Sequence, residues 1–182
     1  MWFILIVLIV ILFTSLIVLW VVYNQLVAAR ESIEEALSGI DIQLKKRFEL
    51  IPGLVEIVKG YSNHEADLFK KVTSLRSSGD TDMVQKEKED AGLNIVSRSI
   101  KITFENYPQL KANENFLELM KELSTVEDEL AMSRRYLNGT IRDYNTKIDV
   151  FPNVLFAGLF GFKERPFYEI ESFERKPHKI FE

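Results

Sequence analysis

The first 29 residues of this chain carry no charged side chain, although 50 of its 182 residues are Asp, Glu, Lys or Arg. Within them, residues 2–22 form an apolar run in which 17 of 21 positions are Leu, Ile, Val or Phe. An α-helix needs about 20 such residues to cross a hydrocarbon core about 30 Å thick, and insertion of this run is favoured by roughly 5–10 kcal/mol. The sequence therefore predicts a single transmembrane helix that contacts membrane lipid through residues 2–22.

The alternative for this run is a cleaved signal peptide, because Val27-Ala28-Ala29 resembles a small-residue cleavage site. No Lys or Arg precedes the run, and it is longer than the roughly 7–15 apolar residues of a signal peptide, so an uncleaved anchor is favoured. Arg30 and then Lys45-Lys46-Arg47 follow it. By the positive-inside rule, we expect a single-pass protein of the cell membrane with its N-terminus outside and its domain in the cytoplasm.

The rest of the chain is expected to be all-α. Residues 23–149 show no strand-like alternation and are interrupted by breakers at Pro52-Gly53, at residues 77–80 and at Tyr107-Pro108. Three of the four intervals carry apolar residues at helical spacing. These residues are Leu26, Ile33, Leu37, Ile40 and Leu44 in the first interval, Leu54, Val58, Tyr61, Leu68, Val72 and Leu75 in the second, and Phe116, Leu119, Leu123, Val126, Leu130, Leu137, Tyr144 and Ile148 in the fourth.

The third interval has a weaker pattern. It opens with Asp82 and Gln85 at the spacing of a capping box, and its apolar residues, Ile95, Ile100, Ile102 and Phe104, are only loosely arranged. Four helices joined by short connections predict an up-and-down four-helix bundle behind the transmembrane helix. The predicted parts are an anchor over residues 1–22, a helical bundle with a coiled-coil-like seam over residues 23–149, and a Phe-rich segment with a charged tail over residues 150–182.

Pro52-Gly53 has two interpretations. Proline is favoured in the first turn of a helix, so we prefer a corner between two helices at this point. The alternative is a kink in one very long first helix, which leaves three helices.

A polar stripe accompanies the apolar seam of the last predicted helix. Arg135, Asn138, Arg142 and Asn145 share one helix face, and Glu31 and Glu34 lie on a polar line of the first predicted helix. If these helices are antiparallel neighbours, Arg142 falls opposite Glu31, and Arg135 falls near Glu34 or Ser38. Structural pairing and two separately solvated faces remain equal alternatives.

The segment of residues 151–162 is uncharged and rich in Phe. Twelve residues are too few to span a bilayer. In an even-numbered bundle the segment returns to the membrane end, where Phe151, Phe156, Phe160 and Phe162 are expected to contact lipid. The alternative is that the segment covers the open end of the bundle core.

No reactive constellation is evident in the sequence. Cysteine is absent, and the two histidines, His64 and His178, do not form a metal-binding pair; His64-Glu65 starts like a zinc motif, but Leu68 stands where the second histidine is needed. We therefore expect no catalytic, cofactor-binding or metal-binding residues and no cofactor. The net charge of −4 argues against binding of nucleic acid.

Several blocks of residues form an ordered set from about residue 23 to residue 162. They include Tyr23-Asn24-Gln25-Leu26, Lys45-Lys46-Arg47, Leu50-Ile51-Pro52-Gly53-Leu54, Tyr107-Pro108-Gln109-Leu110, Arg134-Arg135-Tyr136-Leu137-Asn138, Asp143-Tyr144-Asn145, Phe151-Pro152 and Leu159-Phe160-Gly161-Phe162. Together these blocks resemble the LemA family of bacterial proteins. The resemblance implies a helical bundle on one N-terminal membrane helix, with the domain inside. It implies no activity, because the family has no agreed biochemical function.

Three functions are compatible with this sequence. The leading one is a membrane-anchored, non-catalytic helical scaffold. Its expected partner is an unidentified protein, for example a membrane protein, and the chain can also form a homo-oligomer. The second is a membrane-remodelling or lipid-contacting protein that acts through the Phe-rich segment. The third is a membrane-bound hydrolase, or an accessory of one, that uses His64 together with carboxylates.

Overall fold

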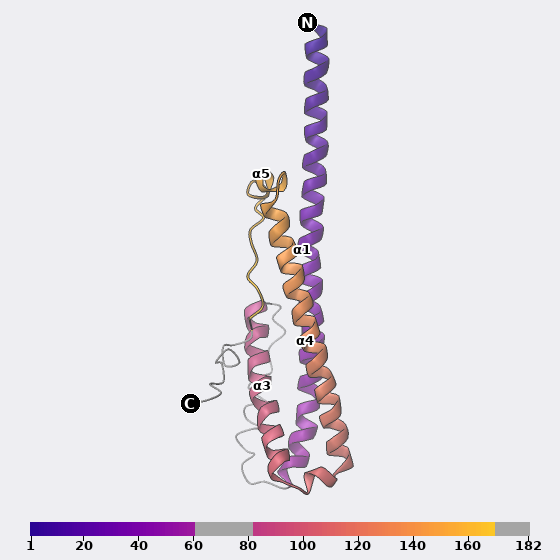
Figure 1. Ribbon diagram of the computed structural model, residues 1–182, viewed down its shortest axis with the longest axis vertical. Coiled ribbons are helices and arrows are strands. Elements are labelled where there is room, and N and C mark those ends of the chain that lie inside the picture. The colour runs from indigo at the N-terminus through magenta and orange to yellow at the C-terminus, as the bar shows by residue number, and fades with distance from the viewer. Residues whose placement is uncertain (61–81, 170–182) are drawn as a thin grey trace, which may run out of the picture. The chain divides into compact units, whose positions relative to one another are not determined.

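The computed structural model describes residues 1–60 and 82–169 (Figure 1). Its described elements are the α-helices α1 (Trp2–Lys59), α3 (Met83–Asn106), α4 (Glu114–Asp149) and α5 (Asn153–Ala157), together with a 3₁₀ turn, η1 (Leu110–Ala112). No strand occurs among these residues. The expected all-α class is therefore confirmed. His64 and His178 lie outside the described residues.

The corner expected at Pro52-Gly53 is wrong. Helix α1 continues through Pro52 and ends at Lys59, so the first six residues of the expected second helix belong to α1. Pro52 is exposed, whereas Ile51, Leu54 and Val55 beside it are buried and hold the helix against its neighbours. The packing of these side chains outweighs the backbone hydrogen bond that Pro52 cannot donate. The remainder of the expected second helix falls in residues 61–81, outside the described part.

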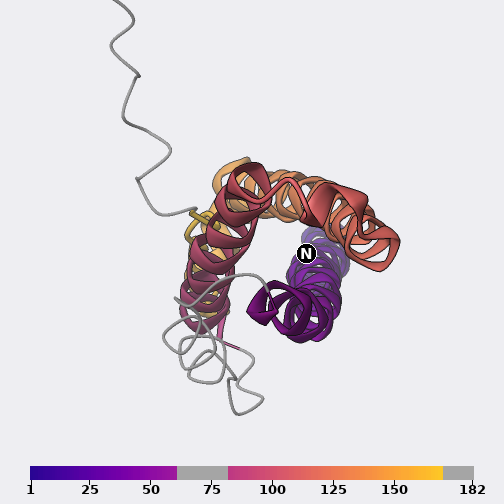
Figure 2. The same ribbon diagram turned by 90° about the horizontal axis from the view of Figure 1, so that it is seen from below.

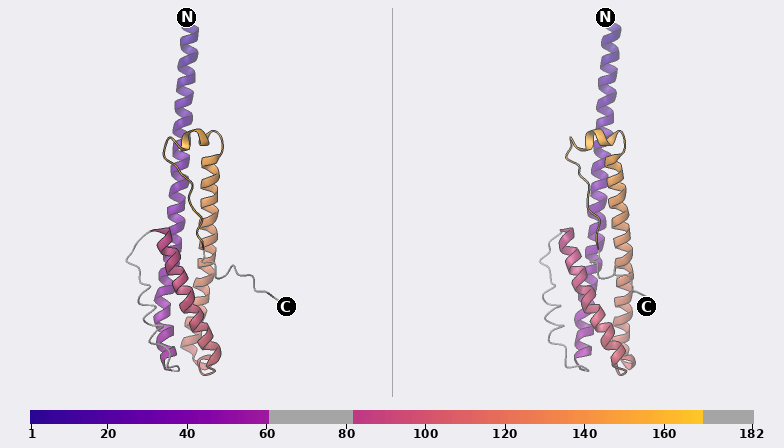
Figure 3. Two further views of the ribbon diagram at one scale, coloured as in Figure 1. Left: turned by 90° about the vertical axis from the view of Figure 1, so that its left-hand side faces the viewer. Right: turned by 60° about the vertical axis from the view of Figure 1, so that its left-hand side comes forward.

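The chain divides into two compact units. The first unit combines Met1–Ala36 of the N-terminal part with Tyr136–Phe167, and Figures 1 and 3 show the end of α4 running beside α1 in this unit. Its core contains two buried stripes, Val22, Leu26, Ala29, Ile33 and Ala36 on α1, and Leu137, Ile141, Tyr144 and Ile148 on α4. Helix α1 is the one helix among the described residues that is long and apolar enough to cross a membrane, and the side chains of its residues 2–21 are largely exposed.

The second unit contains the Leu37–Arg135 part of the chain and the segment from Tyr168 onward. Figure 2 looks at its helices from below. Ion pairs and ring contacts give their directions: α3 is parallel to α1, because Asp41 pairs with Lys86 and Arg47 with Asp90, while α4 is antiparallel to both. Helix α3 begins directly after Asp82, as the capping-box spacing predicts, but the Asp82 side chain makes no capping hydrogen bond.

Candidate functional site

A compact turn closes the end of the first unit. After α4 ends at Asp149, residues 150–162 form a cap that contains α5. The side-chain amide of Asn153 donates a 2.8 Å hydrogen bond to the carbonyl of Lys147, one of the carbonyls that a helix end leaves unpaired. Gly161 has a φ of 75°, which turns the chain out of the cap, and the Phe162 amide then bonds the Ala157 carbonyl at 2.9 Å. The cap therefore satisfies much of its own backbone.

Aromatic contacts hold the cap on α1 immediately after the apolar run. The ring of Tyr23 lies edge-on to Phe160 and Phe162, with centroid distances of 5.2 and 6.0 Å. The guanidinium carbon of Arg30 lies 5.9 Å from the centre of the Phe162 ring. Such contacts stabilise aromatic clusters beyond simple burial.

The four phenylalanines expected at the membrane have different environments. Phe151 is 79% exposed and Phe160 is 42% exposed, Phe156 is half-buried, and Phe162 is buried under Tyr23 and Arg30. Sequence reasoning missed Val154, Leu155 and Leu159, which are exposed on the same cap. Only the exposed members are free to contact a ligand or a membrane.

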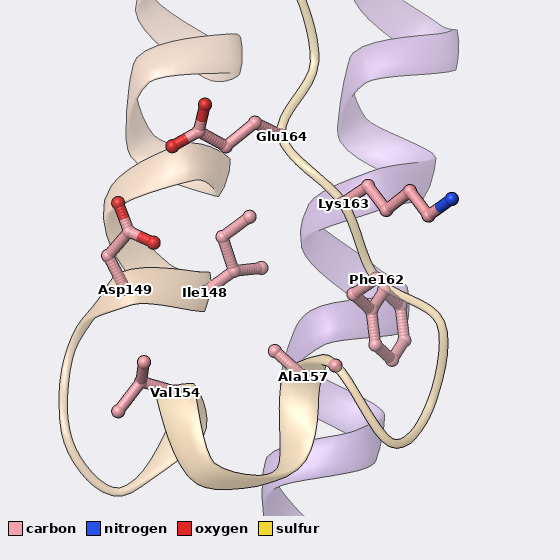
Figure 4. Close-up of a pocket in the computed structure, with 8 residues that line it drawn as sticks. Ile148, Asp149, Val154, Ala157, Phe162, Lys163 and Glu164 are labelled. Atoms are coloured by element: carbon pink, nitrogen blue, oxygen red, sulfur yellow. The ribbon is translucent and has the colours of Figure 1, made fainter.

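An open hollow of about 500 Å³ lies on the inner side of the cap (Figure 4). It is lined by Ile148, Asp149, Val154, Ala157, Gly158, Phe162, Lys163 and Glu164. Figure 4 shows the carboxylates of Asp149 and Glu164 on the α4 side, with the Lys163 ammonium pointing away from them. The described residues contain no group of three acidic or histidine side chains that could hold a metal ion.

The strap, residues 163–167, leaves the cap in an extended conformation. The hydroxyl of Tyr144 donates a 3.0 Å hydrogen bond to the Lys163 carbonyl. The side-chain amide of Asn145 bonds both the carbonyl and the amide of Arg165, each at 2.9 Å. A side chain of α4 thus replaces the partner strand that an extended backbone otherwise needs.

The polar stripe has partners of several kinds. Asn145 holds the strap, and the Arg165 side chain lies 3.3 Å from the Glu34 carboxylate. The Glu31 carboxylate lies 3.5 Å from Arg30. Arg142 is 4.0 Å from Asp143, with both side chains more than 70% exposed, Arg135 is exposed, and Asn138 is half-buried. The pairing of Arg135 and Arg142 with acids of α1 stays a prediction.

The second unit contains a buried charge cluster that the sequence analysis did not predict. Arg47 of α1 is 1% exposed, and its guanidinium contacts Asp90 at 3.4 Å and Glu127 at 3.0 Å. Asn94 and Ser97 of α3 also bond Arg47, at 2.8 and 3.1 Å. The Asp90 carboxylate is bound as well by Arg134. Four side chains on two helices thus compensate the burial of Arg47.

Burial shifts the pKa values of two side chains in this cluster. Burial lowers the pKa of Arg47, and the charges of Glu127 and Asp90 oppose that shift. Burial raises the pKa of Tyr168, and the neighbouring Asp90 carboxylate raises it further. The Tyr168 hydroxyl, which donates to Asp90 at 3.1 Å, therefore stays protonated.

A signal for this cluster is present in the sequence. Arg47 continues the apolar stripe of Ile40, Leu44 and Ile51 at three- and four-residue spacing, so it occupies a core position. Asp90 similarly precedes the buried Leu93 and Ser97 of α3. A charge in an apolar stripe indicates a buried pair, but the stripe does not identify the partner.

The sequence model of the LemA family matches residues 36–181, a stretch that contains the charge cluster, the cap and the strap. The chain belongs to the LemA family. Protein LemA of Metamycoplasma hominis is 28% identical over 131 residues, which cover 70% of this chain and 60% of that protein. Magnetosome proteins MamQ 1 and MamQ 2 of Paramagnetospirillum magneticum are each 20% identical over 175 residues, 81% of this chain and 64% of theirs. This LemA-family chain therefore spans less than two thirds of each of these relatives.

Proposed function

We propose that this LemA-family chain is a membrane-anchored, non-catalytic helical scaffold that holds a protein partner near the bilayer. The observation that carries the proposal is the change in side-chain exposure along α1. Its side chains are largely exposed from Trp2 to Val21, and a buried stripe begins at Val22 on the same helix. In the first unit the candidate span thus enters a folded core without an intervening loop.

This continuity suits a positioning role. A flexible linker lets a tethered domain sample many distances from its anchor, whereas a helix rises 1.5 Å with each residue and fixes that distance. The core side chains of Val22 and Leu26 would be lost from the first unit if the chain were cleaved after Ala29, which supports an uncleaved anchor.

The surface offered to a partner is on α4. Met132 and Tyr136 lie one turn apart on this helix and are 58% and 61% exposed. Aromatic and methionine side chains are enriched at protein interfaces, so each of these exposed side chains offers a partner an apolar contact.

A photoreactive amino acid at Met132 or Tyr136, activated in native membranes, tests this surface. We expect both positions to yield the same discrete adduct with one other protein. The matched control is Asp143, which is also exposed on α4 and should yield no such product. Adducts with lipid alone, or equal products from all three positions, would contradict the scaffold role.

The proposed topology places the N-terminus outside the cell membrane and the helical units in the cytoplasm. It rests on Arg30 and the basic residues that follow the span. A tag added after Glu182 should react with an impermeant reagent only when the cells are opened. Labelling of the tag on intact cells would reverse the topology.

A further inference from the structure

We propose that the cap, residues 150–162, is a second membrane contact, which inserts Phe151, Leu155 and Leu159 into the interfacial layer of the bilayer that α1 spans. The first argument is depth. Val22 is the first strongly buried residue of α1, and the next residue, Tyr23, contacts Phe160 and Phe162 of the cap. The cap thus lies at the level where a span of about 20 residues, about 30 Å long, leaves the hydrocarbon.

The second argument is the composition of the exposed cap surface. Five exposed side chains of the cap that do not line the hollow are apolar: Val150, Phe151, Leu155, Leu159 and Phe160 are 42–79% exposed. Several exposed apolar side chains within one short segment are typical of an interaction site in a soluble protein. Here it continues the exposed apolar surface of Val21 and Tyr23 on α1, so the bilayer that surrounds the span is the occupant.

The third argument concerns the backbone, which must not carry unpaired amides into lipid. Several amides of the cap are bonded within it, at 2.9–3.3 Å: Val154 to Val150, Leu155 to Pro152, Phe160 to Phe156, Gly161 to Gly158 and Phe162 to Ala157. Insertion of the exposed side chains therefore requires no loss of these hydrogen bonds.

The charges next to the cap are of both signs. Asp149 and Glu164 are acidic, and Lys147 and Lys163 are basic. Two further basic side chains, those of Arg30 and Arg165, each lie within 3.5 Å of a glutamate of α1. Contact driven by apolar burial is insensitive to salt, whereas adsorption on anionic lipid is weakened by it. The proposed contact is of the first kind and needs no anionic headgroup.

The test uses the full-length chain, which has no cysteine of its own. Single Phe151→Cys, Leu155→Cys and Leu159→Cys variants carry an environment-sensitive fluorophore and are reconstituted into phosphatidylcholine vesicles with spin-labelled lipid. We expect strong quenching by the lipid at these positions, as at a Leu8→Cys control in the span. The matched outer control is Tyr136→Cys, which is in the same unit, is equally exposed and should stay in water.

A second variant measures how much the apolar side chains of the cap contribute to its insertion. Leu155→Ser together with Leu159→Ser should lower the ratio of inserted to water-exposed label at Phe151 at least tenfold, since a fully buried large apolar side chain is worth about a factor of ten or more. Both residues are exposed, so helix content should not change. Tyr136→Ser should leave the ratio unaltered.

Three results would overturn the proposal. The first is that labels on the cap behave like the label at Tyr136. The second is quenching that appears only with anionic lipid and disappears in high salt, and the third is a label shielded from both lipid and water, which indicates a second copy of the chain. The vesicles contain no other protein. Failure here is therefore distinct from failure of the α4 surface to bind a partner.

Discussion

The hydroxyl of Tyr168 donates a 3.1 Å hydrogen bond to Asp90, a carboxylate that two arginines of the second unit also bind. Asp90 is therefore one of the points where the segment that follows the strap joins the helices of that unit; the Glu169 amide, which donates to the Glu87 carboxylate at 2.8 Å, is another. Asp90→Ala leaves the Arg47 charge buried without its full compensation, so we expect a loss of about 3–5 kcal/mol in the free energy of unfolding. Asp143→Ala, at an exposed position, should change it by less than about 0.5 kcal/mol.

The hydrogen bond itself is tested by Tyr168→Phe, which keeps the ring. We expect a cost of about 1–2 kcal/mol, because the acceptor is charged but retains its other donors. Denaturant titration measures the free energy of unfolding of Asp90→Ala and of Tyr168→Phe. A neutral Tyr168→Phe would show that the hydroxyl adds nothing to the contacts of the ring and of the Glu169 amide, which bonds Glu87.

Alkaline pH should weaken the same contact. The pKa of Tyr168 is raised in the folded protein, so its stabilising effect is intact below the ordinary tyrosine pKa of about 10 and is lost as the pH rises above that value. Between about pH 10 and pH 12, the wild type should lose unfolding free energy faster than Tyr168→Phe does. Parallel pH profiles of the two proteins would contradict the assignment.

The strap should depend on Asn145. Asn145→Ala removes both hydrogen bonds to Arg165, and we expect faster hydrogen exchange at the Arg165 amide together with a loss of about 1–2 kcal/mol. Asp143→Ala, at an exposed position of α4, serves as the control. Unchanged exchange in Asn145→Ala would mean that other contacts hold the strap.

Pro52 should lower the stability of the protein by weakening α1 locally. Because the helix continues through this position, Pro52→Ala restores an amide to the Phe48 carbonyl and should stabilise the protein by about 1–3 kcal/mol. Gly53 is less suitable for substitution, since an added Cβ would lie 3.3 Å from Leu119. A loss of stability in Pro52→Ala would argue for a turn at this point.

The seam of α4 offers a matched pair of core and surface sites. Leu123 is fully buried, so Leu123→Ala should cost about 2–5 kcal/mol, whereas Met132→Ala should cost less than about 1 kcal/mol because Met132 is exposed. Thermal or denaturant unfolding distinguishes the two. Similar losses at both positions would place Met132 in an interface that the isolated chain already forms.

The fold was predictable where one physical effect dominates. The apolar run ends at Val22, and the surface of α1 changes from exposed to buried at that residue. In the α4 seam, Phe116, Leu123 and Leu130 are buried as their spacing predicts. Hydrophobic periodicity is enough in these places because neighbouring residues all favour the same face.

Prediction failed where long-range packing opposes a local preference. Pro52 is a helix breaker by itself, but the buried side chains around it maintain α1. Ile95 and Ile102 of α3 are exposed, while Lys86, Asp90 and Ser97 of the same helix are buried. The partners of Asp90 are more than 40 residues away in sequence, so no local pattern identifies them.

The uninterrupted α1 also fixes a rotational phase between the span and the first unit. Each residue turns a helix by about 100°, so one residue inserted before Val22 would rotate every lipid-facing side chain by that angle while Val22, Leu26 and Ala29 stay packed. A lipid bilayer is the same in all lateral directions and is indifferent to this rotation. A span that recognises a neighbouring helix is sensitive to this rotation. Tolerance to such insertions therefore distinguishes an anchor from a second recognition surface.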